Sequence, residues 1–208
     1  MSQTIAGYPF IAVKNVNIGW VLENVLTKNE CDFIIKSSEQ FLKPSTTISD
    51  GVDVETDHRT SMNCFMNYKN PISGKIAKYV QEIMLQADGV RVPFENFEDM
   101  QVVRYKTGDR YKEHNDFFDE TEQEELKSGG QRIWSALVYL NNVSNGGGTE
   151  FLKLHKTIYP KRGRMVVWKN TIDGKTIDAT EHQGLAPIGC EKWACNVWVR
   201  EGDVNGTR

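Results

Sequence analysis

The sequence has few cysteines, no long apolar run and no excess of basic residues, and each of these absences excludes a class of protein. Its four cysteines among 208 residues are too few and too scattered for a disulfide scaffold, so we expect free buried thiols. No stretch approaches the roughly 20 apolar residues that span a bilayer. Lysine and arginine total 25 against 28 acidic residues, which excludes nucleic acid as the principal partner.

The N-terminal residues also lack the basic stretch followed by an apolar one that marks a secretion signal. We therefore expect a soluble, cytoplasmic protein without a membrane partner. The length and the apolar fraction of 39% are typical of one globular domain, which we place over residues 1–208. No feature of the sequence indicates an oligomeric state.

The hydrophobic pattern divides the chain into two parts. The first, from about residue 15 to 95, contains two helical patterns. LTKNECDFIIKSSEQFL has Thr27 and Glu30 at the spacing of a capping box, and ISGKIAKYVQEIMLQA is amphipathic. Between them the polar segment SDGVDVETDHRTSM predicts a long loop.

From about residue 96 to 200 the pattern changes to short β-rich runs bounded by Gly, Pro, Asn or Asp. These runs are MQVVRY, RIWSALVYL, TEFL, RMVVW and KWACNVWVRE. Several short strands with turn signals predict an antiparallel sandwich, barrel or jelly roll. The expected fold class is therefore mainly β with flanking helices (α+β). The acidic insert DFFDETEQEELKSGGQ predicts a solvated loop or short helix, with a mobile lid as the alternative.

One of the four histidines has a carboxylate at the spacing of a metal ligand. His114 and Asp116 are two residues apart, and on a strand such residues project from the same face. His182 supplies a third ligand if a turn at residues 186–189 brings it back against the first strand. Two histidines and one carboxylate with open positions are typical of non-haem Fe(II) oxygenases. No partner at ligand spacing accompanies the other two histidines, His58 and His155.

Lys192 adds a positive charge near this predicted metal site. Pro187 lies midway between His182 and Lys192, which predicts a hairpin with the two residues on facing strands. The charges of Fe(II), the Asp116 carboxylate, the Lys192 ammonium and a dicarboxylate sum to zero, which relieves the cost of burying them. A pocket of this composition fits 2-oxoglutarate.

The order and spacing of these residues resembles the iron- and 2-oxoglutarate-dependent prolyl 4-hydroxylase family. Other segments are similar as well: QVVRYKTGDRYKEHND resembles the strand that leads into the family's His-x-Asp motif, and GGGTEF and PKRGRMVVW resemble its later strands. LTKNECDFII resembles the N-terminal helix and HRTSM the substrate-side loop. The resemblance covers about residues 20 to 200. It implies a double-stranded β-helix (jelly-roll) core over about 96–200, preceded by supporting helices and the substrate-side loop over about 15–95.

The resemblance also implies which residues hold the cofactors. The metal ligands, which carry catalysis, would be His114, Asp116 and His182. Lys192 would pair with the distal carboxylate of 2-oxoglutarate, and Tyr105 and Thr149 would hydrogen-bond to the same carboxylate. Fe(II), 2-oxoglutarate, O2 and ascorbate are the implied cofactors.

The activity implied by the resemblance is hydroxylation of peptidyl proline at C4, with oxidative decarboxylation of 2-oxoglutarate to succinate and CO2. The implied partner is a proline-containing peptide or protein, contacted by Tyr111, Arg132, Trp198 and Glu98. Two alternatives remain open at this point. The same catalyst could act on another peptidyl residue, such as lysine, or on a free amino acid. The chain could also be a non-catalytic jelly-roll module that binds metal.

Overall fold

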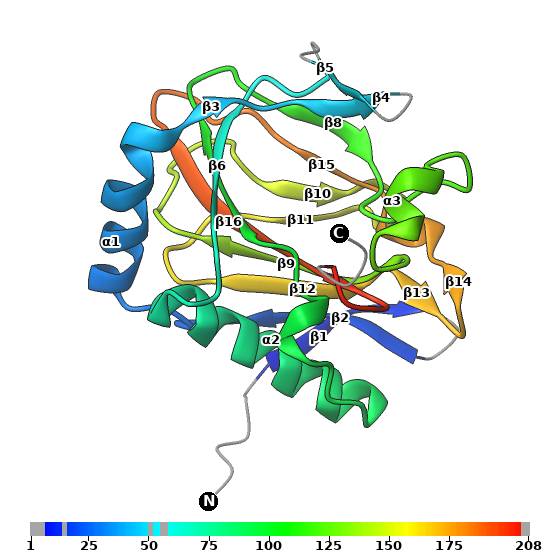
Figure 1. Ribbon diagram of the computed structural model, residues 1–208. Helices are drawn as coiled ribbons and strands as arrows, with labels where there is room; N and C mark the ends of the chain where they lie inside the picture. The colour runs from blue at the N-terminus through cyan, green and yellow to red at the C-terminus, as the bar shows by residue number, and fades with distance from the viewer. Residues whose placement is uncertain (1–6, 14–15, 50–51, 55–57, 205–208) are drawn as a thin grey trace, which may run out of the picture.

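The computed structural model describes residues 7–13, 16–49, 52–54 and 58–204, and its core consists of two antiparallel sheets that face each other (Figure 1). The larger sheet has the strand order β1 (Gly7–Val13), β2 (Val16–Leu22), β12 (Met165–Lys169), β9 (Arg132–Tyr139), β16 (Lys192–Arg200), β7 (Met100–Tyr105), β6 (Met62–Met66) and β3 (Lys43–Pro44). The smaller sheet has the order β11 (Lys156–Ile158), β10 (Thr149–Phe151), β15 (His182–Gly184) and β8 (Tyr111–His114). This arrangement confirms the expected α+β fold with a jelly-roll core.

The N-terminal part of the chain contributes more than helices. Four of its strands, β1, β2, β3 and β6, belong to the larger sheet, where β2 pairs with β12 and β6 with β7. The segment predicted as a long loop begins at the end of β4 (Thr47–Ser49) and contains β5 (Val52–Val54), which pairs with β4, and its residues 50–51 and 55–57 lie outside the described ranges. A further small pair is β13 (Thr171–Ile172) with β14 (Lys175–Thr176). The pairings of β2 with β12 and of β6 with β7 join strands that are far apart in the sequence, which local patterns do not reveal.

Both predicted helices form and have the expected end signals. Helix α1 (Lys28–Ser38) begins after the predicted capping box, in which the Glu30 amide donates to Thr27 Oγ1 and the Thr27 amide donates to the Glu30 carboxylate. Helix α2 (Pro71–Asp88) begins after Asn70, whose side chain accepts from the Ile72 amide, and it ends at Gly89 in the left-handed conformation. No described helix is both long and apolar enough to cross a membrane.

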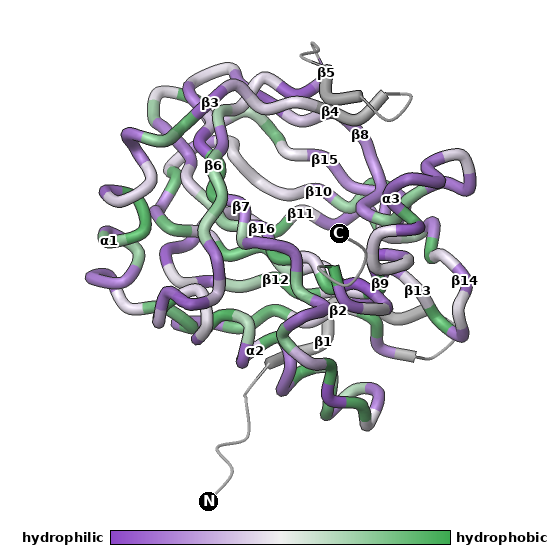
Figure 2. Tube along the Cα trace, in the orientation of Figure 1, coloured by the Kyte–Doolittle hydropathy of each residue, from purple (hydrophilic) through white to green (hydrophobic). Residues whose placement is uncertain are grey.

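Side chains alternate along each strand, so the two faces of the larger sheet pack against different parts of the molecule. One face packs against α1 and α2, and Val102, Val138, Val167 and Val197 belong to this cluster. The other face looks towards the smaller sheet and contributes Val103, Tyr139, Val166 and Ala194. The acidic insert forms the short helix α3 (Gln123–Lys127), which lies in a largely hydrophilic segment (Figure 2). The site described next lies between the two sheets.

Candidate metal centre and ligand pocket

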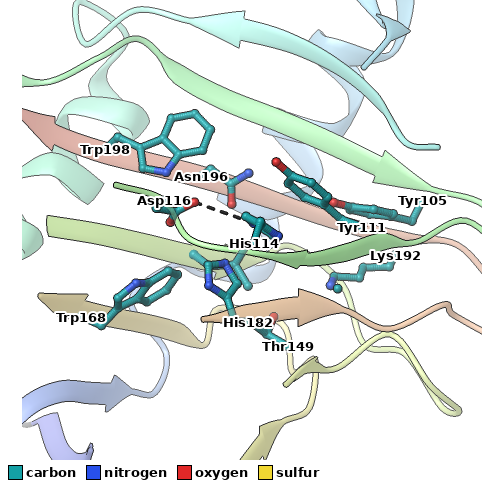
Figure 3. A pocket seen from close by; sticks show the side chains of 12 residues that line it. Tyr105, Tyr111, His114, Asp116, Thr149, Trp168, His182, Lys192, Asn196 and Trp198 are labelled. Atoms are coloured by element: carbon teal, nitrogen blue, oxygen red, sulfur yellow. Dashed lines mark ion pairs between the residues drawn. The ribbon is translucent and has the colours of Figure 1, made fainter. Parts of the chain in front are cut away.

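Three side chains, two from the smaller sheet and one from the bend after β8, converge on one point. His114 is the last residue of β8 and His182 the first of β15, and the two are paired across these antiparallel strands. Asp116 follows β8 by two residues. One donor atom from each of the three residues lies within 4.8 Å of the other two, and His114 Nε2 is 3.8 Å from Asp116 Oδ1 (Figure 3). Because β8 ends at His114, a bend rather than strand periodicity brings Asp116 to this point, contrary to our expectation.

The backbone fixes which nitrogen of each histidine is free. Nδ1 of His114 lies 2.7 Å from the carbonyl oxygen of Lys112, and Nδ1 of His182 lies 2.9 Å from that of Thr180. A carbonyl oxygen only accepts, so each Nδ1 carries the proton and donates it. Each Nε2 therefore keeps its lone pair, which is the form of histidine that binds a metal ion.

The electrostatic surroundings favour the ligand form of these groups. Burial, supported by the neighbouring His182, lowers the pKa of His114 to about 3, so its imidazole is neutral at pH 7. Burial opposes ionisation of Asp116, but His182, His114 and Arg132 outweigh it and hold the pKa of that carboxyl below its usual range. A neutral imidazole beside an ionised carboxylate suits a divalent cation such as Fe(II).

Lys192 lies across the pocket from His182, and the hairpin predicted between them is wrong. Lys192 begins β16 in the larger sheet, opposite Tyr105 of β7, whereas His182 is in the smaller sheet. The turn residue Pro187 instead forms an isolated bridge with Gly146. In a jelly roll, consecutive strands pass to different sheets, so the spacing of ten residues does not make these two strands neighbours.

The ammonium group of Lys192 is buried without a carboxylate partner. The residue is 2% exposed, and Nζ lies 5.1 Å and 5.5 Å from the ring centres of Tyr105 and Tyr139. No carboxylate of the described residues comes within 4.0 Å of it. Burial lowers the pKa of Lys192 from its ordinary value of 10.5 to about 7. A buried ammonium group without a carboxylate partner favours the binding of an anion.

Thr149 lines this end of the pocket, and Tyr139 lies behind it. Thr149 is on β10, and its Oγ1 lies 2.7 Å from the Tyr139 hydroxyl, which is also 2.8 Å from the carbonyl oxygen of Ile158. Thr149 and Tyr105 are placed with Lys192 as the sequence predicted. Tyr139 was not predicted, although its position on β9 two residues after the inward-facing Leu137 gives it the same face.

The residues predicted for the substrate side divide into two groups. Tyr111 and Trp198 line the pocket, and the Tyr111 ring stacks on His114 with 3.6 Å between centres. Arg132 does not line it: its guanidinium lies 4.1 Å from the Trp198 ring and forms two hydrogen bonds with Glu98, of 2.7 Å and 2.6 Å. Burial opposes ionisation of Glu98, but Arg132 and Arg200 outweigh it and lower its pKa. The Arg132–Glu98 pair therefore supports the pocket wall from behind.

The complete pocket has a volume of about 430 Å³, including the part that is open to solvent. Its walls include four residues that sequence reasoning did not single out, namely Leu137, Trp168, Gly184 and Asn196. Asn196 and Trp198 have the parity of Lys192 along β16, so strand alternation was a signal that could have found Asn196. His58 and His155 do not belong to the metal group, as expected.

Comparison with known proteins identifies the family. Residues 100–200 match the family model of the 2OG-Fe(II) oxygenase superfamily. The chain is 33% identical over 190 residues to the putative prolyl 4-hydroxylase of Acanthamoeba polyphaga mimivirus, covering 89% of this chain and 75% of that protein. It is 31% identical over 200 residues to prolyl 4-hydroxylase 1 of Arabidopsis thaliana, covering 87% and 68%. The chain belongs to the iron- and 2-oxoglutarate-dependent prolyl 4-hydroxylase family.

A solved structure of this family has the same fold. The crystal structure of the viral collagen prolyl hydroxylase from Paramecium bursaria Chlorella virus-1, in its 2OG complex, matches with a TM-score of 0.73 and 27% identity. The match covers 91% of this chain and 99% of that one. The protein is thus a 2-oxoglutarate-dependent dioxygenase of the prolyl 4-hydroxylase type, which uses Fe(II), 2-oxoglutarate and O2. The resemblance noted from the motifs is confirmed.

Proposed function

We propose that this protein hydroxylates prolyl residues of a peptide or protein at C4, while 2-oxoglutarate is converted to succinate and CO2. The observation that carries the proposal is the pairing of two sites in one pocket. A group of two imidazoles and a carboxylate lies at one end, and the buried Lys192 ammonium lies at the other. This pairing fits a metal ion together with an anionic cosubstrate that reaches from one to the other.

In this proposal His114, Asp116 and His182 hold Fe(II) through Nε2 of each histidine and the carboxylate. The ion would supply the centre at which O2 and 2-oxoglutarate react. The protein's own contribution is orientation: the Lys112 and Thr180 carbonyls hold both imidazoles in one tautomer before the metal arrives. Because the ligand atoms are already close together, little conformational freedom remains to be lost on binding.

At the other end, Lys192, Tyr105 and Thr149 bind the distal carboxylate of 2-oxoglutarate. The carboxylate restores the charge of Lys192, because an adjacent anion raises the pKa of an ammonium group. Thr149 then donates its hydroxyl proton to the ligand. Tyr139 compensates by turning its single hydroxyl proton from the Ile158 carbonyl oxygen to Thr149 Oγ1, which lies 2.7 Å away, so the hydroxyls form a directed chain towards the anion.

On the substrate side, Tyr111 and Trp198 provide aromatic surface for a proline ring, which is mainly apolar and offers no N–H donor within a peptide. Arg132 and Glu98 act together on this wall. Glu98 holds the guanidinium of Arg132, and that guanidinium lies over the Trp198 ring. Ascorbate is the proposed reductant that keeps the iron in the Fe(II) state.

The decisive experiment is mass spectrometry of proline-rich and lysine-containing peptides after incubation with the protein, Fe(II), 2-oxoglutarate and ascorbate in air. We expect one added oxygen, located by fragmentation on proline, and none when 2-oxoglutarate is omitted. Omission of ascorbate is expected to reduce the yield over many turnovers. Oxygen on lysine would instead favour the alternative substrate class. Absence of both oxygen transfer and succinate would contradict the proposal.

A further inference from the structure

Gln101 lies on the pocket-side face of the larger sheet, on β7 between β6 and β16. Its register partners are Phe65 on β6 and Asn196 on β16. The side chain is 4% exposed although it is polar. A buried polar side chain is expected to be hydrogen-bonded, and the arrangement of its partners then indicates what it holds in place. Gln101 is the first residue of the segment QVVRYKTGDRYKEHND, but neither the metal-ligand spacing nor the family resemblance gives it a role.

The side-chain oxygen of Gln101 accepts hydrogen bonds from two different strands or loops. Arg59 Nη2 donates to Oε1 over 2.7 Å, and Asn196 Nδ2 donates to the same atom over 3.1 Å. A guanidinium has only donors, so the oxygen of Gln101, and not its nitrogen, must face Arg59. The same oxygen orients the Asn196 carboxamide, because only the nitrogen of that group can donate.

The two donors come from different parts of the fold: Asn196 lines the pocket, whereas Arg59 lies behind Tyr111, which lines it. Arg59 precedes β6, and its Cζ lies 4.7 Å from the centre of the Tyr111 ring, which in turn stacks on His114. Asn196 lines the pocket, and its oxygen is turned towards His114 (Figure 3). One atom of Gln101 therefore fixes both the guanidinium that covers Tyr111 and the direction of an acceptor inside the pocket.

We propose that Gln101 is a positioning residue that aligns Arg59 and Asn196 for binding of the peptide. This inference rests on the proposed function, because the peptide is the ligand that it concerns. Gln101 is absent from the residues that line the pocket, so it acts through its two partners. Its loss is expected to affect the peptide and not the cosubstrate, whose proposed contacts lie around Lys192.

The first test measures KM for the peptide and KM for 2-oxoglutarate in two variants of Gln101 and in one control variant. Q101M keeps the approximate length and removes both hydrogen bonds, whereas Q101E keeps an oxygen acceptor for both donors. We expect Q101M to raise KM for the peptide by about tenfold or more, because a donor charge loses its partner. KM for 2-oxoglutarate and the Fe(II) affinity should not change. Q101E should recover most of the peptide affinity.

The matched control is Q81M. Gln81 is also buried, at 5% exposure, and donates to the Val92 carbonyl, but it lies on α2 on the other side of the larger sheet. Q81M should lower stability and leave KM for the peptide unchanged. An unchanged KM for the peptide in Q101M would overturn the proposal, as would a Q101E variant that behaves like Q101M.

A second readout does not require turnover. The Thr60 amide donates to the Arg110 carbonyl and the Lys112 amide to the His58 carbonyl, which joins the Arg59 segment to β8. Hydrogen exchange at these two amides should be faster in Q101M than in Q101E or Q81M. If the wild-type protein leaves prolyl peptides unmodified, the proposed function fails. Hydrogen exchange at these amides still tests whether Gln101 positions the Arg59 segment. Equal exchange in all three variants would then refute its positioning role.

Discussion

The two faces of β16 are almost equally buried, but one is a core and the other is a site. On the helix side, Trp193, Cys195, Val197 and Val199 pack against apolar neighbours from α1, α2 and the adjacent strands. On the pocket side, Lys192 is 2% exposed and has no carboxylate partner among the described residues. Burial alone therefore does not distinguish a hydrophobic core from a binding site. The distinguishing property is whether the buried groups satisfy one another.

The largest effect is expected where a metal ligand is removed from the pocket side. His182→Ala should abolish turnover and weaken Fe(II) binding by more than about a hundredfold, since even outer contacts of a metal site contribute ten- to hundredfold. Metal titration by calorimetry and succinate formation measure the two effects. His155→Ala is the control, because His155 is exposed and outside the metal group. Full activity of the His182 variant would remove that residue from the ligand set.

Next in size is the effect of replacing the buried cation. Lys192→Met should raise KM for 2-oxoglutarate by about ten- to hundredfold, since a charge-assisted hydrogen bond is lost. The ligand-free variant should nevertheless be more stable by about 1–4 kcal/mol, because an unpaired buried charge is replaced by an apolar group. Urea unfolding and steady-state kinetics measure these opposite changes.

The control for that variant is Lys169→Met on β12. Lys169 is also buried but is paired with Asp88, so its removal leaves a carboxylate without its partner. We expect this variant to lose stability and to keep its KM for 2-oxoglutarate. Equal behaviour of the two methionine variants would show that the two lysines do not differ as the structure indicates.

The helix side of β16 should respond in stability alone. Val197→Ala removes two methyl groups from a fully buried position and should cost about 2 kcal/mol of unfolding free energy. Neither Michaelis constant should change. A raised KM for 2-oxoglutarate in this variant would mean that the two faces of the strand are coupled.

The smallest predicted step is the change per pH unit that Lys192 gives to the stability of the ligand-free protein. Its pKa is about 7 when folded, against an ordinary value of 10.5. Between these values the unfolded chain binds the proton and the folded chain does not, so stability rises with pH by up to about 1.4 kcal/mol per unit. The difference between wild-type and Lys192→Met unfolding free energies from pH 6.5 to 10 isolates this contribution. A difference that does not vary with pH would contradict it.

The local elements and the metal motif could be predicted from the sequence because their signals are short. β7 occupies the six residues of the run MQVVRY, and α1 begins after the capping box formed by Thr27 and Glu30. The His114, Asp116 and His182 group was predicted from spacing and lies together. At the 2-oxoglutarate end, Lys192 was predicted from its spacing to His182, and Tyr105 and Thr149 were named through the family resemblance. All three line the same pocket.

The parts that could not be predicted depend on which strands become neighbours. The spacing of His182 and Lys192 suggested a hairpin, but sheet membership is decided by packing over long sequence distances, and the two residues face each other from different sheets. The pairing of β2 with β12 is equally non-local. Gln101 lies within the strand pattern MQVVRY, but no pattern indicates its role, because that role depends on Arg59 and Asn196, which lie 42 and 95 residues away along the chain.

The tethers that hold the two histidines have a consequence for how the sequence can vary. Both acceptors are main-chain carbonyls, at residues 112 and 180, so no side-chain replacement at either position removes them. Lys112 can therefore change freely, for example to adapt the surface near the pocket to a new peptide, without altering the tautomer of His114. The orientation of the two imidazoles therefore depends on the course of the backbone and not on the side chains at residues 112 and 180.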